Sequence, residues 1–228
     1  MDLIIASNNK NKVREIKEIL SGSFDNFYSL KDIGLDIDIE ETGETFFENS
    51  LIKAKTIAEI TGKVCIADDS GLMVDVLDGK PGVYSARFAG EPCNDTKNNE
   101  KLIHLLKNYS YEQKTAKFVS CIVLYYPNGK YITSTGEVKG HILDNYRGNG
   151  GFGYDPLFFA DELSKTFGEA TSVEKNKISH RARALEDLKS KIWKQWLYFL
   201  MYIMISVHCQ DWKTLWMRQI MLFLLVMA

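Results

Sequence analysis

Apolar and polar positions alternate along the chain in two periods, one typical of strands and one of helices. Residues 3–6 form an apolar run of the kind found in buried strands, which predicts a strand over residues 2–6. After six polar residues, apolar side chains recur at helical spacing from Val13 to Leu20, which predicts a helix over residues 9–21. The same reasoning predicts strands over 24–30, 64–68, 117–126 and 130–140, helices over 45–60 and 94–107, and final helices from about Val173. This mixture predicts an α/β fold with a mixed sheet.

The polar stretch between the first strand and the first helix reads SNNKNK, residues 7–12. Free N–H groups at a helix start favour an anion, and Ser7, Asn9 and Lys12 could add hydrogen bonds and charge. This pattern predicts a phosphate-binding turn. The alternative is that Ser7 or Asn9 only caps the helix.

Two acidic segments carry candidate metal ligands. In LDIDIE, residues 35–40, period-2 alternation predicts a strand with three apolar residues on one face and three carboxylates on the other, and Glu41 at its end. The second segment, Asp68-Asp69-Ser70-Gly71, follows an apolar strand at the end where α/β sheets usually build sites. Such oxygen ligands suit Mg²⁺. The alternative for residues 35–40 is a solvated edge strand, and the alternative for residues 68–71 is a turn without a metal.

Three other segments bear on ligand binding. The 45–60 helix presents Phe47, Leu51, Ala54 and Ala58 as its core face, which predicts that Lys53 lies off the buried stripe. The loop GNGGFGYDPLFF, residues 148–159, offers glycine backbone and aromatic rings to a flat ligand, or is simply a flexible hairpin. Near the end, Ser179 is a candidate N-cap that places His180 and Arg181 in the first turn, where positive charge requires an anionic or hydrogen-bonding partner.

Composition bounds the class of protein. The 228 residues suffice for one domain with an appendage, and a net charge of −2 argues against a large nucleic-acid interface. The four cysteines lack paired metal spacing and predict free thiols in a reducing cytoplasm. We therefore expect a cytoplasmic protein.

The composition changes abruptly near residue 191. All four tryptophans and five of the seven methionines follow it, within apolar runs shorter than the roughly 20 residues of a membrane-spanning helix. We expect a domain over residues 1–190 and an atypical extension over 191–228. The extension is open to three interpretations: a packed helical hairpin, an interfacial membrane contact, or a segment foreign to the domain.

Five motifs occur in order across residues 3–188 and together carry a family resemblance. They are a strand followed by SxNxxK and a helix, EETGxTFxENxxxKA, ADDSGLxVDxLxGxPGVYSARFAG, GGFGYDPLFF and EKNxxSHRxxAL. The set closely resembles the inosine triphosphate pyrophosphatases, also called dITP/XTP pyrophosphatases. The resemblance implies a twisted mixed sheet with flanking helices, two lobes around a deep substrate cleft, and a homodimer. It also implies Mg²⁺-dependent hydrolysis of ITP, dITP and XTP to monophosphate and pyrophosphate, which cleanses the nucleotide pool. Family chains end soon after the SHR helix, so the extension departs from the pattern.

The resemblance also implies roles for single residues. Asp69 corresponds to the catalytic acceptor and a metal ligand, and Glu40 to a second metal ligand, with Glu41 as its alternate. The substrate-binding residues implied are Ser7, Asn8, Asn9, Lys10, Asn11, Lys12, Lys53, Ser70, Phe152, Gly153, Tyr154, Asp155, Lys175, His180 and Arg181. Two other functions stay open: a house-cleaning pyrophosphatase of the septum-inhibitor-like group, and a nucleotide-binding protein without turnover.

Overall fold

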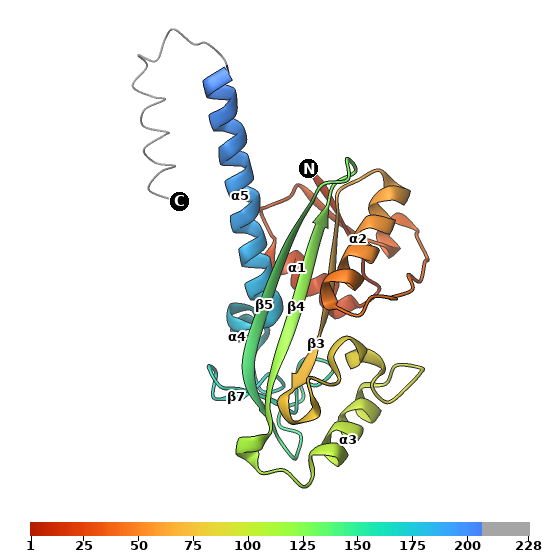
Figure 1. Cartoon of the computed structure of the whole chain (residues 1–228), viewed down its shortest axis with the longest axis vertical. Coiled ribbons are helices and arrows are strands. Elements are labelled where there is room, and N and C mark those ends of the chain that lie inside the picture. Colours follow the sequence, from red (N-terminus) through yellow and green to blue (C-terminus); the bar gives the residue numbers. More distant parts are fainter. Residues whose placement is uncertain (207–228) are drawn as a thin grey trace. The chain divides into compact units, whose positions relative to one another are not determined.

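The computed structural model describes residues 1–206 of the chain (Figure 1). It divides into two compact units, Met1–Leu188 and Lys189–Ala228. Everything that follows on the sheet and the site concerns the first unit. Of the second unit, residues 189–206 are described, as the continuation of helix α5 (His180–Ser206).

A seven-stranded mixed sheet runs through the first unit in the order β2-β1-β3-β4-β5-β6-β7. Strand β3 pairs parallel with β1 and antiparallel with β4. Strand β1 also pairs parallel with β2, and the pairs from β4 to β7 are antiparallel. The predicted mixed α/β sheet is therefore confirmed. Its strands are β1 (Asp2–Ile5), β2 (Asn26–Ser29), β3 (Cys65–Val74), β4 (Thr115–Tyr125), β5 (Tyr131–Ile142), β6 (Phe158–Ala160) and β7 (Lys165–Thr166).

The helices begin and end at the residues that the capping pattern indicates. The side chain of Thr45 and that of Glu48 form a reciprocal capping box, and Gly62 ends the same helix in the left-handed conformation. Ser179 also caps its helix, because its Oγ accepts from the Ala182 N–H. The α-helices are α1 (Lys10–Ile19), α2 (Phe46–Thr61), α3 (Asp95–Leu106), α4 (Ser172–Ile178) and α5, and the 3₁₀ turns are η1 (Lys31–Ile33), η2 (Asp75–Leu77), η3 (Gly82–Arg87) and η4 (Tyr111–Gln113).

Strand β3 is longer than predicted, and this changes the setting of its aspartates. We expected the strand to end at Asp68, but its ladder with β4 continues from Cys65 to Val74. The parallel ladder with β1, by contrast, includes only Cys65 and Ile66. Asp68 and Asp69 therefore lie in mid-strand, just beyond the point where β1 stops covering that edge. The prediction of a strand end was wrong because polar residues in this strand are satisfied by neighbouring elements rather than by a turn.

The segment 35–40 is not a strand, which corrects a second prediction. Its alternation is real, since Leu35, Ile37 and Ile39 are half-buried and the carboxylates between them are exposed. The three apolar side chains pack against a cluster that includes Leu30 and Ala54. An extended chain lying across a hydrophobic cluster produces the same period-2 pattern as a strand, without ladder hydrogen bonds.

Two hydrophobic clusters lie at opposite ends of β3. One contains Cys65 and Ala67 from the start of the strand, and the other contains Leu72 and Val74 from its end. The polar run Asp68-Asp69-Ser70 falls between them. The long strands β3, β4 and β5 run side by side in Figure 1, with α2 packed on β3 and β4. Apolar clusters therefore lie on both sides of the polar residues at the middle of β3. The two lobes that the family resemblance implies stay a prediction.

The described part of the second unit is a helix with large exposed side chains. Trp193 is 67% exposed and Tyr198 is 72% exposed. Within the described residues, no helix is long and apolar enough to cross a membrane. The other two tryptophans and most of the predicted apolar runs lie outside the described residues, so the three interpretations of the extension stay predictions.

We predict that Gly136→Ala destabilises the first unit where α5 begins. A Cβ at Gly136 would lie 2.2 Å from the carbonyl oxygen of His180 and 2.4 Å from the backbone nitrogen of Ala184. Overpacking of this kind costs about 1–3 kcal/mol, so thermal melts should show a lower Tm. Ser134→Ala is the matched control, because Ser134 lies two residues away on the same strand and its buried Oγ has no partner. A Gly136→Ala protein that melts like Ser134→Ala would contradict this close approach.

Candidate active site

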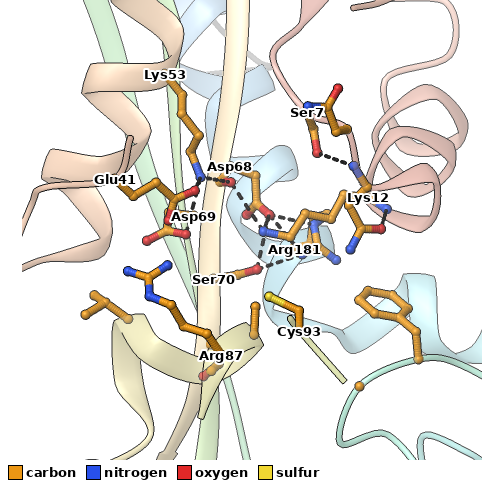
Figure 2. A pocket seen from close by; sticks show the side chains of 18 of the residues that line it. Ser7, Lys12, Glu41, Lys53, Asp68, Asp69, Ser70, Arg87, Cys93 and Arg181 are labelled. Atoms are coloured by element: carbon orange, nitrogen blue, oxygen red, sulfur yellow. Dashed lines mark hydrogen bonds and ion pairs between the residues drawn. The ribbon is translucent and has the colours of Figure 1, made fainter. Parts of the chain in front are cut away.

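A pocket of about 690 Å³ opens beside the polar centre of β3 (Figure 2). Segments far apart in the sequence form its walls: the turn before α1, residues 37–41, the middle of β3, η3, the glycine-rich loop and the junction of α4 with α5. It contains both charged side chains and aromatic rings. This composition suits a ligand with an anionic part and a flat part.

The turn before α1 is already a capped helix start. Asn9 Oδ1 accepts from the N–H groups of Asn11 and Lys12, at 2.9 and 3.2 Å. Ser7 Oγ accepts in turn from the Asn9 N–H at 3.2 Å. Asn9 therefore caps α1 and occupies two of the N–H groups at the helix start, while phosphate binding by this turn stays a prediction. The Lys12 side chain still points into the pocket.

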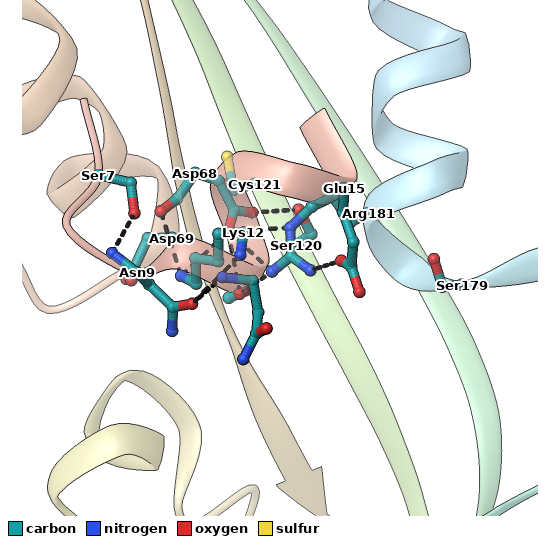
Figure 3. A network of polar contacts seen from close by, with 12 residues as sticks. Ser7, Asn9, Lys12, Glu15, Asp68, Asp69, Ser120, Cys121, Ser179 and Arg181 are labelled. Atoms are coloured by element: carbon teal, nitrogen blue, oxygen red, sulfur yellow. Dashed lines mark hydrogen bonds and ion pairs between the residues drawn. The ribbon is translucent and has the colours of Figure 1, made fainter. Parts of the chain in front are cut away.

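Asp68 is the centre of a buried polar network on one face of β3 (Figure 3). Its carboxylate accepts from Ser120, lies 3.0 Å from Lys12 Nζ and 2.9 Å from Arg181 Nη2. Burial opposes ionisation, but Arg181 and Lys12 hold the pKa of Asp68 well below its ordinary value. Asp68 is therefore a buried carboxylate that is ionised at neutral pH.

Arg181 is 1% exposed and its guanidinium is almost fully engaged. It donates to Asp68, to Glu15 of α1 and, at 2.9 Å, to Ser70 Oγ. Burial disfavours the charge of Arg181, but the two carboxylates raise its pKa above the ordinary value. The sequence expectation of an anionic partner for this helix start is confirmed. The partners are internal carboxylates, so Arg181 has little capacity left for a ligand.

A second charged cluster lies on the opposite face of β3. Lys53 Nζ is 2.8 Å from Glu41 Oε1, 3.3 Å from Asp69 Oδ1 and 3.1 Å from the Asp68 carbonyl oxygen. Asn49 donates to the other oxygen of Asp69 at 3.2 Å. Burial raises the pKa of Asp69 although Lys53 opposes that shift. Asp69 is thus a carboxylate with increased basicity, and Lys53 and Asn49 each hold one of its two oxygens.

The placement of Lys53 corrects the sequence interpretation of α2. Lys53 lies on the buried stripe of the helix, together with Asn49, Ser50 and Ile57, and is not a solvated residue. The prediction was wrong because the helix packs against a polar part of β3. There, Ser50 Oγ donates to the Cys121 carbonyl and accepts from the Asp69 N–H at 2.6 Å.

The far end of the pocket combines aromatic rings with a third ion pair. Lys175 Nζ lies 2.7 Å from Asp155 Oδ2, 3.2 Å from Glu15 Oε1 and 4.6 Å from the centre of the Phe152 ring. Tyr154 is fixed by a hydrogen bond from its hydroxyl to the Ser85 carbonyl at 2.9 Å. The glycine-rich loop is therefore an ordered wall, not a flexible hairpin.

His180 completes this end with an unsatisfied ring nitrogen. Its ring stacks on Phe118 at 4.8 Å, and its Nδ1 is buried without a hydrogen-bond partner. Burial, together with Arg181 and Lys175, holds the pKa of His180 well below its ordinary value. The ring lines the pocket, and this buried nitrogen has no hydrogen-bond partner among the described residues.

The pocket gathers nearly all the residues that the sequence singled out. Lys10 and Asn11 do not line it; Lys10 faces a separate groove on α1. Sequence reasoning missed Glu15 and Arg87. The spacing of Glu15, three residues after Lys12, places both on one helix face and could have indicated it. Nothing comparable distinguishes Arg87 within its motif. The predicted residues that line the pocket are Ser7, Asn8, Asn9, Lys12, Glu40, Glu41, Lys53, Asp69, Ser70, Phe152, Gly153, Tyr154, Asp155, Lys175, His180 and Arg181.

Comparison with known proteins agrees with this geometry. The model of the Ham1 family matches residues 3–191. The chain belongs to the Ham1 family. A relative from Clostridium perfringens named dITP/XTP pyrophosphatase is 52% identical over 195 residues, which cover 83% of this chain and 96% of the relative. One from Bacillus subtilis with the same name is 49% identical over 187 residues, covering 82% and 94%.

Solved Ham1 structures share the fold. The Ham1 protein of Staphylococcus aureus has a TM-score of 0.76 and 39% identity, over 86% of this chain and all of that one. A HAM1 protein from Coxiella burnetii gives a TM-score of 0.76 and 36% identity, over 85% and 99%. The resemblance inferred from the five motifs is confirmed. The family match ends at residue 191, and the atypical extension follows it.

We predict that Asp68→Asn strongly destabilises this Ham1 protein. The change leaves Arg181 with one buried carboxylate instead of two, and breaking a buried pair costs about 3–5 kcal/mol. Because the pKa of folded Asp68 lies below the ordinary 3.8, its ionised form stabilises the fold above that pH, and the contribution is lost as the pH falls.

Denaturant unfolding at several pH values checks this expectation. The difference in unfolding free energy between the unmodified protein and Asp68→Asn should be full at pH 7 and shrink below pH 3.8. Asp36→Asn, an exposed carboxylate, is the control and should change little. A difference that grows on acidification would show that Asp68 is not held as a buried anion.

Proposed function

We propose that this Ham1 protein hydrolyses ITP, dITP and XTP to the nucleoside monophosphate and pyrophosphate, and so removes deaminated purine nucleotides. The observation that carries the proposal is one continuous pocket with cations and carboxylates at one end and aromatic rings with a buried histidine at the other. Relatives about 50% identical over nearly their whole length are named dITP/XTP pyrophosphatases. Pocket chemistry and relatedness thus support the same substrates.

The phosphates belong at the end formed by α1 and β3. Lys12 and Lys53 both contact the main-chain oxygen of Asp68, at 3.4 and 3.1 Å, and so approach the same segment of β3 from two elements. The positive end of the α1 dipole adds to their field. Charge that develops on a pyrophosphate leaving group would be stabilised by these fixed cations.

Mg²⁺ fits the acidic side of this end. The oxygens of Glu41 and Asp69 converge on one positive charge, the Lys53 ammonium, while Glu40 is exposed on the same wall. Within residues 1–206, no three acidic, histidine or cysteine side chains form a complete metal cluster. Mg²⁺ usually takes one or two protein carboxylates and completes its shell with phosphate and water. When bound, the ion would neutralise phosphate charge and polarise the phosphoryl oxygens.

Asp69 is the residue placed to activate water. It is 5% exposed, its pKa is raised by burial, and Asn49 and Lys53 fix its two oxygens. A carboxylate of increased basicity at the phosphate end can orient a water molecule and accept its proton. Asp68, held ionised by Arg181 and Lys12, cannot take this role, because its proton affinity is too low.

Discrimination among purines belongs at the aromatic end. Hypoxanthine and xanthine carry a 6-keto oxygen, which accepts hydrogen bonds, where adenine carries an amino group. The free Nδ1 of His180, as a donor tautomer, would be satisfied by a keto oxygen and left unpaired by an amino group. An unpaired buried group costs about 1–3 kcal/mol. Arg181 contributes by fixing the helix start that carries His180.

The family resemblance supports three further parts of the proposal: a homodimer, a cytoplasmic location and Mg²⁺ as the working metal. Nucleic acid is not expected as a partner, because the net charge is −2.

We predict pyrophosphate release from ITP, dITP and XTP, and far slower release from ATP and GTP. The His180 contact accounts for the rejection of adenine; the rejection of guanine, which also carries a 6-keto oxygen, is expected from the family resemblance. The measurement is a coupled pyrophosphate assay on a triphosphate panel, with an orthophosphate assay in parallel. EDTA should abolish the activity, and added Mg²⁺ should restore it. Orthophosphate as the primary product would place the cleaved bond elsewhere, and equal rates for all purines would remove the role of the aromatic end.

We predict that Asp69→Asn lowers kcat by ~10²-fold or more, because an amide cannot accept the proton of the attacking water. Steady-state kinetics with ITP check this, and circular dichroism verifies that the variant is folded. Asp36→Asn serves as the control for loss of a carboxylate. Turnover close to that of the unmodified enzyme would exclude Asp69 as the base.

A further inference from the structure

Five cationic side chains line the pocket, and four of them already have carboxylate partners. Lys12 pairs with Asp68, Lys53 with Glu41 and Asp69, and Lys175 and Arg181 both pair with Glu15. The fifth is Arg87, at the end of η3. Among the described residues, no carboxylate lies within ion-pair distance of its guanidinium. Arg87 is thus the pocket cation whose charge is available to a ligand.

Arg87 is nevertheless held in a defined position. Its guanidinium carbon lies 5.3 Å from the centre of the Tyr84 ring, on the same 3₁₀ turn. Stacking of this kind uses the flat face of the guanidinium and leaves the N–H groups at its edge free. The turn itself is anchored, because Ser85 Oγ donates to the Gly82 carbonyl at 2.6 Å and accepts from the Leu72 N–H at 2.9 Å.

The direction of Arg87 points to the phosphate end. In Figure 2 its side chain rises from η3 toward the carboxylates of Glu41 and Asp69, on the opposite side of the pocket from α1. Arg87 forms no ion pair with Glu41 or Asp69, and all three side chains line the same pocket. An ammonium or guanidinium aimed at carboxylates across a gap marks a place where a phosphate, with its metal ion, completes the charge balance.

We propose that Arg87 binds the terminal phosphates of the nucleoside triphosphate, from the wall opposite Lys12 and Lys53. The proposal rests on the proposed function for the identity of the substrate. Arg87 thereby contacts the part of the substrate that leaves as pyrophosphate, and its planar fork matches two phosphate oxygens at once. The nucleoside and its first phosphate do not need Arg87.

Calorimetric titration of pyrophosphate and of IMP, each with Mg²⁺, separates these contacts without requiring turnover. Arg87→Ala should weaken pyrophosphate binding roughly 10- to 100-fold, the range expected for a lost charge-assisted hydrogen bond, and change IMP binding little. Arg87→Lys should recover part of the loss, because it restores the charge without the fork. Arg14→Ala is the control: it removes one exposed positive charge from α1 outside the pocket, and should leave both affinities unchanged.

Kinetics with ITP complete the test. Arg87→Ala should raise KM or lower kcat/KM by a similar factor, with a Tm equal to that of Arg14→Ala. Unchanged pyrophosphate binding would overturn the proposal, and so would an equal loss for IMP, which would place Arg87 on the nucleoside. If the unmodified protein fails to hydrolyse ITP, the proposed function fails, while the pyrophosphate titrations still decide the role of Arg87 as an anion contact.

Discussion

The buried ion pair between Asp68 and Arg181 is the constraint on which the site depends. The two residues are 113 positions apart in sequence, and both are about 1% exposed. Two charges out of water are tolerated only when hydrogen bonds satisfy their remaining atoms, and Ser120, Ser70, Lys12 and Glu15 supply these. The pair therefore fixes three elements at once: the middle of β3, the start of α1 and the start of α5. Displacement of any one of these three elements would leave a buried charge without its partner, so the elements hold one another in place.

This network also explains why the pocket is prearranged. Each paired lysine is held by a carboxylate before substrate binds. Binding therefore costs little additional side-chain entropy. The carboxylates reduce the net positive field, however, and a triphosphate brings several negative charges. A divalent cation beside Glu41 and Asp69 would restore the balance. The proposed cation dependence thus follows from the pairing of Lys12, Lys53, Lys175 and Arg181 with carboxylates.

The sequence predicted most elements of the fold because they follow local rules. Apolar residues at helical spacing located α2, and strand patterns on either side of a turn located β4 and β5. Predictions failed where tertiary partners decide: β3 continues past Asp69 because β4 pairs with it, and Lys53 is buried because β3 is polar at that point. The motifs named most of the residues that line the pocket. The sequence did not predict which residues contact one another, because the partner of Arg181 on α1 lies 166 positions away.

A strand with two aspartates and a serine at its centre is a poor strand by propensity, and its existence needs a physical reason. The hydrophobic clusters at its two ends supply one, because each anchors β3 independently of the polar residues between them. The polar side chains then alternate: Asp68 and Ser70 turn to α1 and α5, and Asp69 turns to α2. Each face gives its aspartate a different environment, with two cations fixing one as an anion and burial raising the proton affinity of the other. The alternation of a single strand thus gives Asp68 a structural role and gives Asp69 the environment on which its proposed chemical role rests.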